Sequence, residues 1–141
     1  MVIRARAGQR FSKSVVLSAG DVADFARAAG DENPIHHDRE FAASTRFGKP
    51  IVCGPQSSAL LMGFTASHFS KTGPILGLDF GFRFKAPVFA DQTVHLEWLI
   101  VSVRHSEQLQ GELVDLRGRM VDASGATVVG AKGRVLLRDE Y

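Results

Sequence analysis

The second half of the chain alternates apolar and polar residues at every second position, which is the pattern of strands with one face buried. The pattern occurs four times, over residues 78–85, 94–101, 114–121 and 129–138. Asp122-Ala123-Ser124-Gly125 lies between the last two segments and is typical of a hairpin turn. Four such strands joined by short turns predict an antiparallel meander, whose apolar face another element must cover.

Residues 56–70 supply a helix that can cover this face. They are apolar nearly all round and follow Gly54-Pro55, where the proline is typical of a first helical turn. A helix of this kind should be buried. We therefore predict an α+β fold, with a long central helix wrapped by a curved antiparallel β-sheet, in a single domain over residues 1–141.

The first 50 residues predict shorter elements. Residues 9–18 have the pattern of a strand, and an apolar stripe at helical spacing follows from Ser18 to Gly30. Asn33 precedes a proline and is therefore pushed out of the helical region, so residues 31–36 should form a rigid loop. Asp38 can cap a short helix directly after that loop.

The composition of the 141 residues limits the possible functions. Seventeen Lys and Arg against fifteen Asp and Glu leave a net charge of +2, which is weak for a dedicated nucleic-acid binder. No apolar run reaches the roughly 18 residues of a membrane span, and the N-terminus has no apolar stretch typical of a secretory signal. The single cysteine, Cys53, cannot form an internal disulfide, so we expect a cytoplasmic protein.

Several common catalytic motifs are missing from the sequence. It contains no phosphate-binding glycine loop, no HExxH, no paired CxxC and no nucleophile elbow. The other histidines have no mutual ligand spacing, so we predict neither a metal site nor a cofactor. Cys53 has no base beside it in the sequence, which favours a small buried residue over a nucleophile.

The residues that could carry chemistry lie between Gly30 and Gly54. Asp31 and His36 are five positions apart on the predicted loop, where a carboxylate and an imidazole facing one cavity can polarise a single water. Gly54 opens the buried helix, whose N-terminus suits an oxygen that gains negative charge. Each residue also has a structural alternative: a turn carboxylate, a core histidine and ordinary helix-capping geometry, respectively.

The segment around Asp31 and His36 resembles the hydratase motif of the MaoC-like (R)-specific enoyl-CoA hydratases, which have the hot-dog fold. The residues that carry this likeness are Ala29-Gly30-Asp31-Glu32-Asn33-Pro34-Ile35-His36-His37-Asp38, Phe47-Gly48 and Ile51-Val52-Cys53-Gly54. The likeness continues through residues 77–89 and covers about residues 9 to 138. The chain departs from the family where Cys53-Gly54-Pro55 stands in place of the common His-Gly-Met.

The resemblance implies that Asp31 and His36 hold the water that adds to a trans-2-enoyl thioester, and that the Gly54 N–H binds the thioester oxygen. The further residues that we assign to substrate binding are Asn33, Pro34, Cys53, Gln56, Phe82 and Phe84. Asn33 is favoured as a structural tie of the loop, and the phenylalanines as core residues, some of which could line an acyl pocket. The resemblance also implies an acyl-CoA substrate and a homodimer or higher homo-oligomer. The weak net charge and the lack of a long apolar run predict no nucleic-acid or membrane partner.

Three alternative functions stay open at this point. A dehydratase acting on an acyl carrier protein would need a basic patch near the substrate tunnel, and a hot-dog thioesterase would release a free thiol. A non-catalytic module that only binds acyl thioesters is suggested by the altered Cys53-Gly54-Pro55. Arg83 and Lys85 could pair with coenzyme A phosphates, although an ordinary solvated strand face explains them as well.

Overall fold

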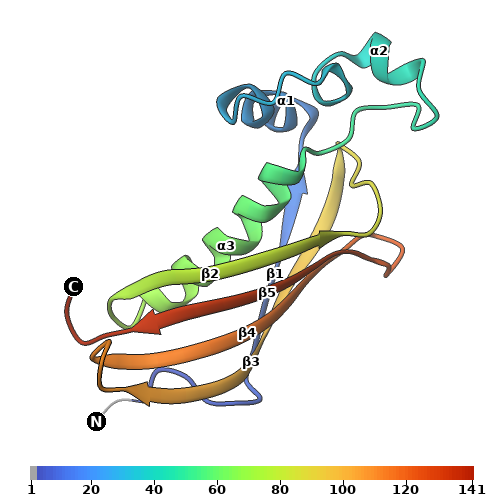
Figure 1. Ribbon diagram of the computed structural model, residues 1–141. Coiled ribbons are helices and arrows are strands. Elements are labelled where there is room, and N and C mark those ends of the chain that lie inside the picture. The colour runs from blue at the N-terminus through green and yellow to red at the C-terminus, as the bar shows by residue number, and fades with distance from the viewer. Residues whose placement is uncertain (1–2) are drawn as a thin grey trace.

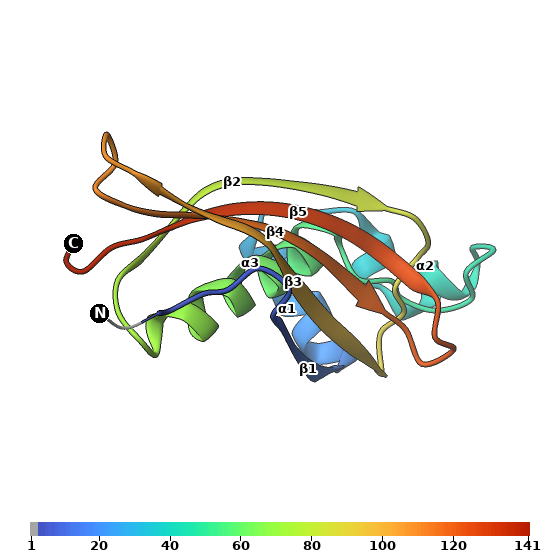
Figure 2. The ribbon, with the colours of Figure 1, turned by 90° about the horizontal axis from the view of Figure 1, so that it is seen from below.

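The computed structural model describes residues 3–141. Its elements in chain order are β1 (Arg10–Leu17), α1 (Ala19–Ala28), the 3-10 helix η1 (Pro34–His36), α2 (Arg39–Ala43), α3 (Gly54–Ser70), β2 (Ile75–Phe84), β3 (Gln92–Ser106), β4 (Gly111–Val121) and β5 (Thr127–Leu137). Figure 1 shows α3 lying along the strands, with α1, η1 and α2 grouped beyond its N-terminal end. Figure 2 shows α3 on one face of the sheet only. The predicted α+β architecture is confirmed.

The five strands form one antiparallel sheet in the order β1-β3-β4-β5-β2. Strands β3, β4 and β5 form the predicted meander, but the prediction that the strand at 78–85 also belongs to it is wrong, because β2 pairs with β5 at the far edge. Residues 88–90 bond instead to the segment before α3. The Val52 N–H donates to the Val88 carbonyl at 2.7 Å, and the Ala90 N–H to the Pro50 carbonyl at 3.1 Å.

Trp98 of β3 anchors α3 to the sheet. Its side chain is fully buried, and its indole N–H donates to the Leu61 carbonyl at 3.0 Å. The ring lies against the backbone of Gly118 on β4, where a Cβ would come within 2.5 Å of the indole. Only a glycine leaves room for this ring, so the close packing of strand, indole and helix depends on it.

Helix α3 is buried on its sheet side alone. Leu61, Phe64 and Phe69 belong to the core. The residues on the opposite side are exposed, namely Met62, Gly63, Ala66 and Ser67. The prediction of a helix buried all round is therefore wrong for this chain, because the sheet covers only one of its sides.

Strand β2 departs from the predicted alternation. Its pairing with β5 shifts between Gly77 and Asp79, and Leu78 beside this irregularity is 46% exposed. Phe80 and Phe82 pack against the core, but Phe84 is 57% exposed. The expectation that Phe84 belongs to the core is wrong, because β2 has no neighbouring strand on its outer side.

Arg4 closes the C-terminal end of α3. Its Nη2 donates to the Phe69 carbonyl at 3.0 Å, and its Nη1 donates to the carbonyls of Pro74 and Arg138 at 2.9 Å each. Its Nε donates to the Thr72 hydroxyl at 3.1 Å. One guanidinium thus ties the helix end to the ends of β2 and β5.

Candidate active site

The loop that carries the candidate catalytic residues starts where α1 ends. The Ser18 hydroxyl caps the helix by accepting from the Asp21 N–H at 3.1 Å. At the other end Gly30 has a φ of +75°, a left-handed conformation that glycine adopts without strain. The chain then turns back, and the Asp31 N–H donates to the Ala26 carbonyl at 2.8 Å. The end of α1 therefore fixes the backbone of Asp31.

Asn33 holds the loop in shape. Its backbone N–H donates to Oδ1 of Asp31 at 3.1 Å, and its side-chain oxygen accepts from the Ile35 N–H at 3.2 Å. Pro34 begins η1 directly after it, with a ring that fixes φ. These two hydrogen bonds fix the shape of the loop, as expected for a structural role of Asn33. One of them occupies a carboxylate oxygen of Asp31.

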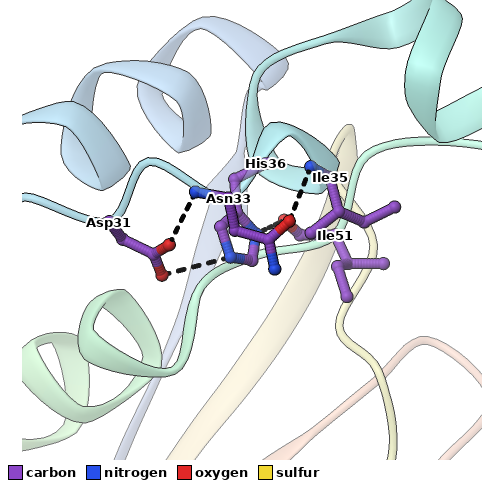
Figure 3. Close-up of polar contacts among 5 residues, drawn as sticks. All are labelled: Asp31, Asn33, Ile35, His36 and Ile51. Atoms are coloured by element: carbon purple, nitrogen blue, oxygen red, sulfur yellow. Dashed lines mark hydrogen bonds and ion pairs between the residues drawn. The ribbon is translucent and has the colours of Figure 1, made fainter.

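The other carboxylate oxygen of Asp31 faces His36. Oδ2 lies 3.2 Å from Nε2, and His36 is only 7% exposed. Nδ1 of His36 lies 2.7 Å from the Ile51 carbonyl. Figure 3 shows the two side chains converging above the segment that leads into α3. The structure thus brings this predicted pair together.

These contacts determine which ring nitrogen of His36 carries hydrogen. The Ile51 carbonyl can only accept, so Nδ1 is the donor. A protonated ring would also donate from Nε2 to Oδ2 of Asp31, whereas a neutral ring faces the carboxylate with the lone pair of Nε2. Two acceptors at this distance need a shared donor, and a water molecule with one O–H toward each group meets that need.

The first turn of α3 offers a free backbone donor next to this pair. Pro55 has no N–H, and the N–H groups of Gln56 and Ser57 both bond to the Cys53 carbonyl, at 3.1 and 3.3 Å. The side chain of Cys53 makes no capping bond at this helix start. Within residues 3–141, the Gly54 N–H is the amide of this turn that stays available to a ligand.

Cys53 is a buried free thiol at the start of α3. Burial raises the pKa of the Cys53 thiol, and the negative charge of Asp31 raises it further, while the N–H groups of Gln56 and Cys53 oppose the shift. The thiol therefore stays protonated at neutral pH and is a poor nucleophile.

The chain is similar in sequence to a known protein family and to several of its members. A family described as MaoC like domain matches residues 4–117. The chain belongs to this family. It is 32% identical over 130 residues to an (R)-specific enoyl-CoA hydratase of Aeromonas caviae, covering 92% of this chain and 93% of the relative. It is 31% identical over 136 residues to 3-hydroxyacyl-thioester dehydratase Z of Mycobacterium tuberculosis, covering 93% and 83%.

Solved structures agree with this assignment. The unliganded R-hydratase PhaJ1 from Pseudomonas aeruginosa superposes with a TM-score of 0.86 at 25% identity, covering 96% of this chain and 84% of that one. The (R)-hydratase from A. caviae gives a TM-score of 0.80 at 29% identity, covering 94% and 97%. The predicted MaoC-like family and hot-dog fold are confirmed.

Phe84 of this MaoC-like domain lies directly over Gly54. A Cβ at Gly54 would be 3.2 to 3.6 Å from the aromatic ring of Phe84, so only a glycine leaves free space between the ring and the helix start. Phe82 points instead into the core, stacked 6.4 Å from Phe80. Of the two phenylalanines predicted to bind substrate, the structure places Phe84 beside Gly54.

Gln56 lies on another side of the same helix turn. It borders a groove of about 430 Å³ between β1 and α1, whose walls include Leu17, Phe25 and Leu60. The side chain is 5% exposed, and its Oε1 has no hydrogen-bond partner within residues 3–141. The structure therefore places Gln56 at the β1–α1 groove and leaves its carbonyl oxygen unsatisfied.

Two residues that support the site were not predicted. Ile51 contributes only a backbone carbonyl, which no side-chain pattern reveals. Asp91 has a φ of +62°, accepts from the Ala19 N–H at 2.9 Å and lies 3.8 Å from Arg39. It thereby ties the starts of α1 and α2 to the start of β3. A positive φ at a non-glycine residue has no reliable sequence signal.

Two features are absent from residues 3–141. No cluster of three or more His, Cys, Asp or Glu side chains has the arrangement of a metal site. No helix in this part of the chain combines the length and hydropathy needed to cross a bilayer.

Proposed function

We propose that this protein catalyses the reversible hydration of a trans-2-enoyl thioester, on coenzyme A, to the (R)-3-hydroxyacyl thioester. The observation that carries the proposal is the 3.2 Å approach of Asp31 Oδ2 to His36 Nε2 beside the free N–H of Gly54. The names of two relatives, an (R)-specific enoyl-CoA hydratase and a 3-hydroxyacyl-thioester dehydratase, support the same reaction class and the predicted enzyme type.

In this proposal Asp31 and His36 hold one water between them. The water oxygen forms a bond to the β-carbon of the enoyl group while the pair accepts one of its protons. The electrons of the carbon–carbon double bond move toward the thioester, whose oxygen gains negative charge. The pair then delivers a proton to the α-carbon, so the reaction adds one water and leaves the enzyme unchanged.

The thioester oxygen in this scheme accepts a hydrogen bond from the Gly54 N–H. The N-terminus of α3 adds a positive dipole end at the same place. This arrangement stabilises the enolate-like charge more than the uncharged substrate, which is the condition for lowering the barrier. The ring of Phe84, within 3.6 Å of a Cβ at Gly54, supplies an apolar wall for the acyl group.

We also propose that the enzyme acts as a homodimer joined through β2. This strand is a free edge of the sheet, and an uncovered edge is a ready site for pairing with another strand. Leu76, Leu78 and Phe84 are each at least 40% exposed on it. Light scattering should show a dimer for the native chain and a weakened dimer for Leu78→Lys. Val101→Lys, which changes a similarly exposed residue of β3, is the matched control.

The single cysteine supports a proposal for the cellular setting. The only thiol of the chain is buried and free, so a reducing compartment suits the protein, and we place its activity in the cytoplasm, within fatty acid metabolism.

The test of the reaction is a spectrophotometric assay with purified protein. We expect loss of the conjugated enoyl absorbance with at least one member of a panel of short, medium, branched and dicarboxylic trans-2-enoyl-CoA esters. No loss across the panel would contradict the proposal. Release of free thiol would instead indicate a thioesterase, and thermal stabilisation by acyl-CoA without turnover would indicate a binding module.

A further inference from the structure

The face of the sheet that points away from α3 carries a basic hollow of about 700 Å³. Its basic residues alternate along the strands with core residues such as Phe11 and Met120, so the two sets point to opposite faces. Six basic side chains line the hollow, with one acidic side chain, Glu97, among them. The basic residues are Arg10, Arg83, Lys85, Arg117, Arg119 and Lys132. More than a third of the chain's 17 Lys and Arg thus gather on one face.

Three of these cations surround Gly130 of β5 and form what we term the Gly130 cluster. Arg83 of β2 and Arg119 of β4 are the register partners of this glycine on the two neighbouring strands, so their Cα atoms lie about 10 Å apart. The side chain of Lys85 lies over the same glycine, where a Cβ would be 3.4 Å from Cε and 3.7 Å from Nζ. Gly130 thus leaves an open floor between three positive groups.

A second group of positive charge lies two residues further along β5, about 7 Å away. Lys132 stands directly opposite Arg117 of β4, and we term these two residues the Lys132 pair. The partner of Lys132 on its other side is Gly81 of β2, which has no side chain. Like charges directly opposite each other destabilise a sheet, so this arrangement lowers the stability of the free protein.

The protein neutralises little of this charge. Glu97 pairs with Arg10 at 2.9 Å and with Arg119 at 3.4 Å. The other four basic side chains of the hollow form no salt bridge within residues 3–141. Further along the same face, by contrast, Asp115 of β4 pairs with its register partner Arg134 of β5 at 2.7 Å. The hollow therefore lacks the internal counter-charge that its neighbours on the face have.

We infer that the hollow binds a linear polyphosphate, either free or as the phosphate chain of a nucleotide. A terminal phosphate carries roughly −1.5 to −2 charges and three acceptor oxygens, so one such group can engage all the donors of the Gly130 cluster. The guanidinium groups of Arg83 and Arg119 suit it further, because they can bind phosphate through two parallel hydrogen bonds. A second, linked phosphate can then reach the Lys132 pair and relieve its repulsion.

The lining disfavours other anionic ligands. Phe82 is the only aromatic residue in the lining and it packs toward the core, so the hollow has no platform for stacking nucleic-acid bases. Leu99 is the one large aliphatic side chain there, too little for insertion into a membrane. Asp31, His36 and Gly54 are not part of the lining. The polyphosphate is therefore a ligand separate from the thioester of the proposed reaction.

The test is isothermal titration of the native chain with inorganic triphosphate at low salt. We expect one saturable site per chain, with at least tenfold weaker binding of orthophosphate, and an affinity that falls as salt rises. Titration with ATP distinguishes the two sources. Equal dissociation constants would show that the phosphate chain alone is recognised, and a lower one for ATP would identify a nucleotide as the ligand. Because no turnover is measured, the result does not depend on the proposed reaction.

Two variants test the geometry of the hollow. Lys132→Glu replaces the like-charge pair with Arg117 by an opposite-charge pair, so without ligand its Tm should equal or exceed that of the native chain. Gly130→Val fills the floor with a residue that suits a strand and should also keep the native Tm. Each should weaken triphosphate binding at least tenfold. Lys71→Glu makes the same charge change outside the hollow and should bind triphosphate normally.

Several outcomes would overturn the inference. The first three are no saturable binding, unchanged affinity in Lys132→Glu, and an equal loss in Lys71→Glu. Orthophosphate or citrate binding as tightly as triphosphate would contradict the need for linked phosphates. Tighter binding of coenzyme A than of triphosphate would assign the hollow to the thioester substrate, and tighter binding of duplex DNA or anionic vesicles would assign it to those partners.

Discussion

At the C-terminal end of α3, here the closed end, the chain itself supplies hydrogen-bond partners for the helix carbonyls. At the N-terminal end, here the open end, polar groups stay without partners. At the closed end the Phe69 carbonyl accepts from the Arg4 guanidinium at 3.0 Å and from the Thr72 N–H at 3.1 Å. At the open end the Gly54 N–H stays free, and the Oε1 of Gln56 is buried without a partner within residues 3–141.

This difference indicates that the two ends of one helix have different roles, one in stability and the other in chemistry. A buried polar group without a partner costs about 1–3 kcal/mol, so a chain selected for stability alone would satisfy both ends. The partners at the closed end come from the protein. The open end lies beside Asp31 and His36, so we expect the substrate to supply the hydrogen-bond acceptor for the Gly54 N–H. Changes at the open end should therefore reduce activity, and changes at the closed end should reduce stability.

The largest expected effect is at the catalytic pair. Asp31→Asn and His36→Ala should each lower kcat by roughly 100-fold or more, because each removes one of the two groups that hold the water. Steady-state hydration of the enoyl-CoA substrate measures this, with thermal unfolding to show that the variants fold. The neighbouring changes Glu32→Gln and His37→Ala are matched controls and should keep native rates. Near-native turnover in both catalytic variants would show that other groups activate the water.

The next effect tests the closed end. Arg4→Ala should lower the free energy of unfolding by about 2 kcal/mol, because it leaves carbonyls at the helix end without their charged donor. Chemical denaturation measures this loss. Arg6→Ala is the control, since its side chain makes no hydrogen bond within residues 3–141. A drop in kcat with unchanged stability for Arg4→Ala would contradict the division between the two ends.

Glycine substitutions compare the open end with the middle of the same helix. Gly54→Ala should lower kcat/KM on the order of tenfold, because a Cβ placed 3.2 Å from the Phe84 ring displaces ring or substrate. Gly63→Ala has nothing within 4 Å of its Cβ and should raise stability by up to about 1 kcal/mol through helix propensity. Equal effects of the two substitutions on kcat/KM would show that Gly54 has no special role in catalysis.

The sequence predicted the catalytic loop better than the position of the strand that carries Phe84. Asp31 and His36 lie within six residues that contain a proline, so local geometry alone could bring them to one side. The place of β2 in the sheet depends on pairing with β5, about 50 residues later, which no local pattern determines. This is why a simple meander was expected and why the exposure of Phe84 was missed.

The partners of His36 illustrate the same limit. Its contact with Asp31 could be expected from the motif, but its bond to the Ile51 carbonyl joins backbone and side chain across 15 residues. Any residue type at position 51 except one that distorts the chain would offer the same carbonyl. Contacts of this kind follow from tertiary structure, and sequence patterns do not reveal them.

A smaller effect is expected at Gln56. Gln56→Met should raise the free energy of unfolding by about 1 kcal/mol, because it removes a buried oxygen that has no partner and keeps a similar shape. If Gln56 also binds substrate, as the sequence suggested, kcat/KM should fall while stability rises. The exposed Gln108→Met should change neither quantity. A loss of stability in Gln56→Met would show that the side chain supports the fold rather than the open end.

The smallest effect is expected at Cys53. The raised pKa of its buried thiol predicts slow alkylation by iodoacetamide in the folded protein and fast alkylation after unfolding, a clean readout because the chain has one cysteine. Cys53→Ala should keep kcat within about threefold, less than about 1 kcal/mol in the barrier, because the thiol fills space without taking part in proton transfer. A loss comparable to that of His36→Ala would instead place the thiol among the reacting groups, and the open end of α3 would then act through a side chain as well as through the amide of Gly54.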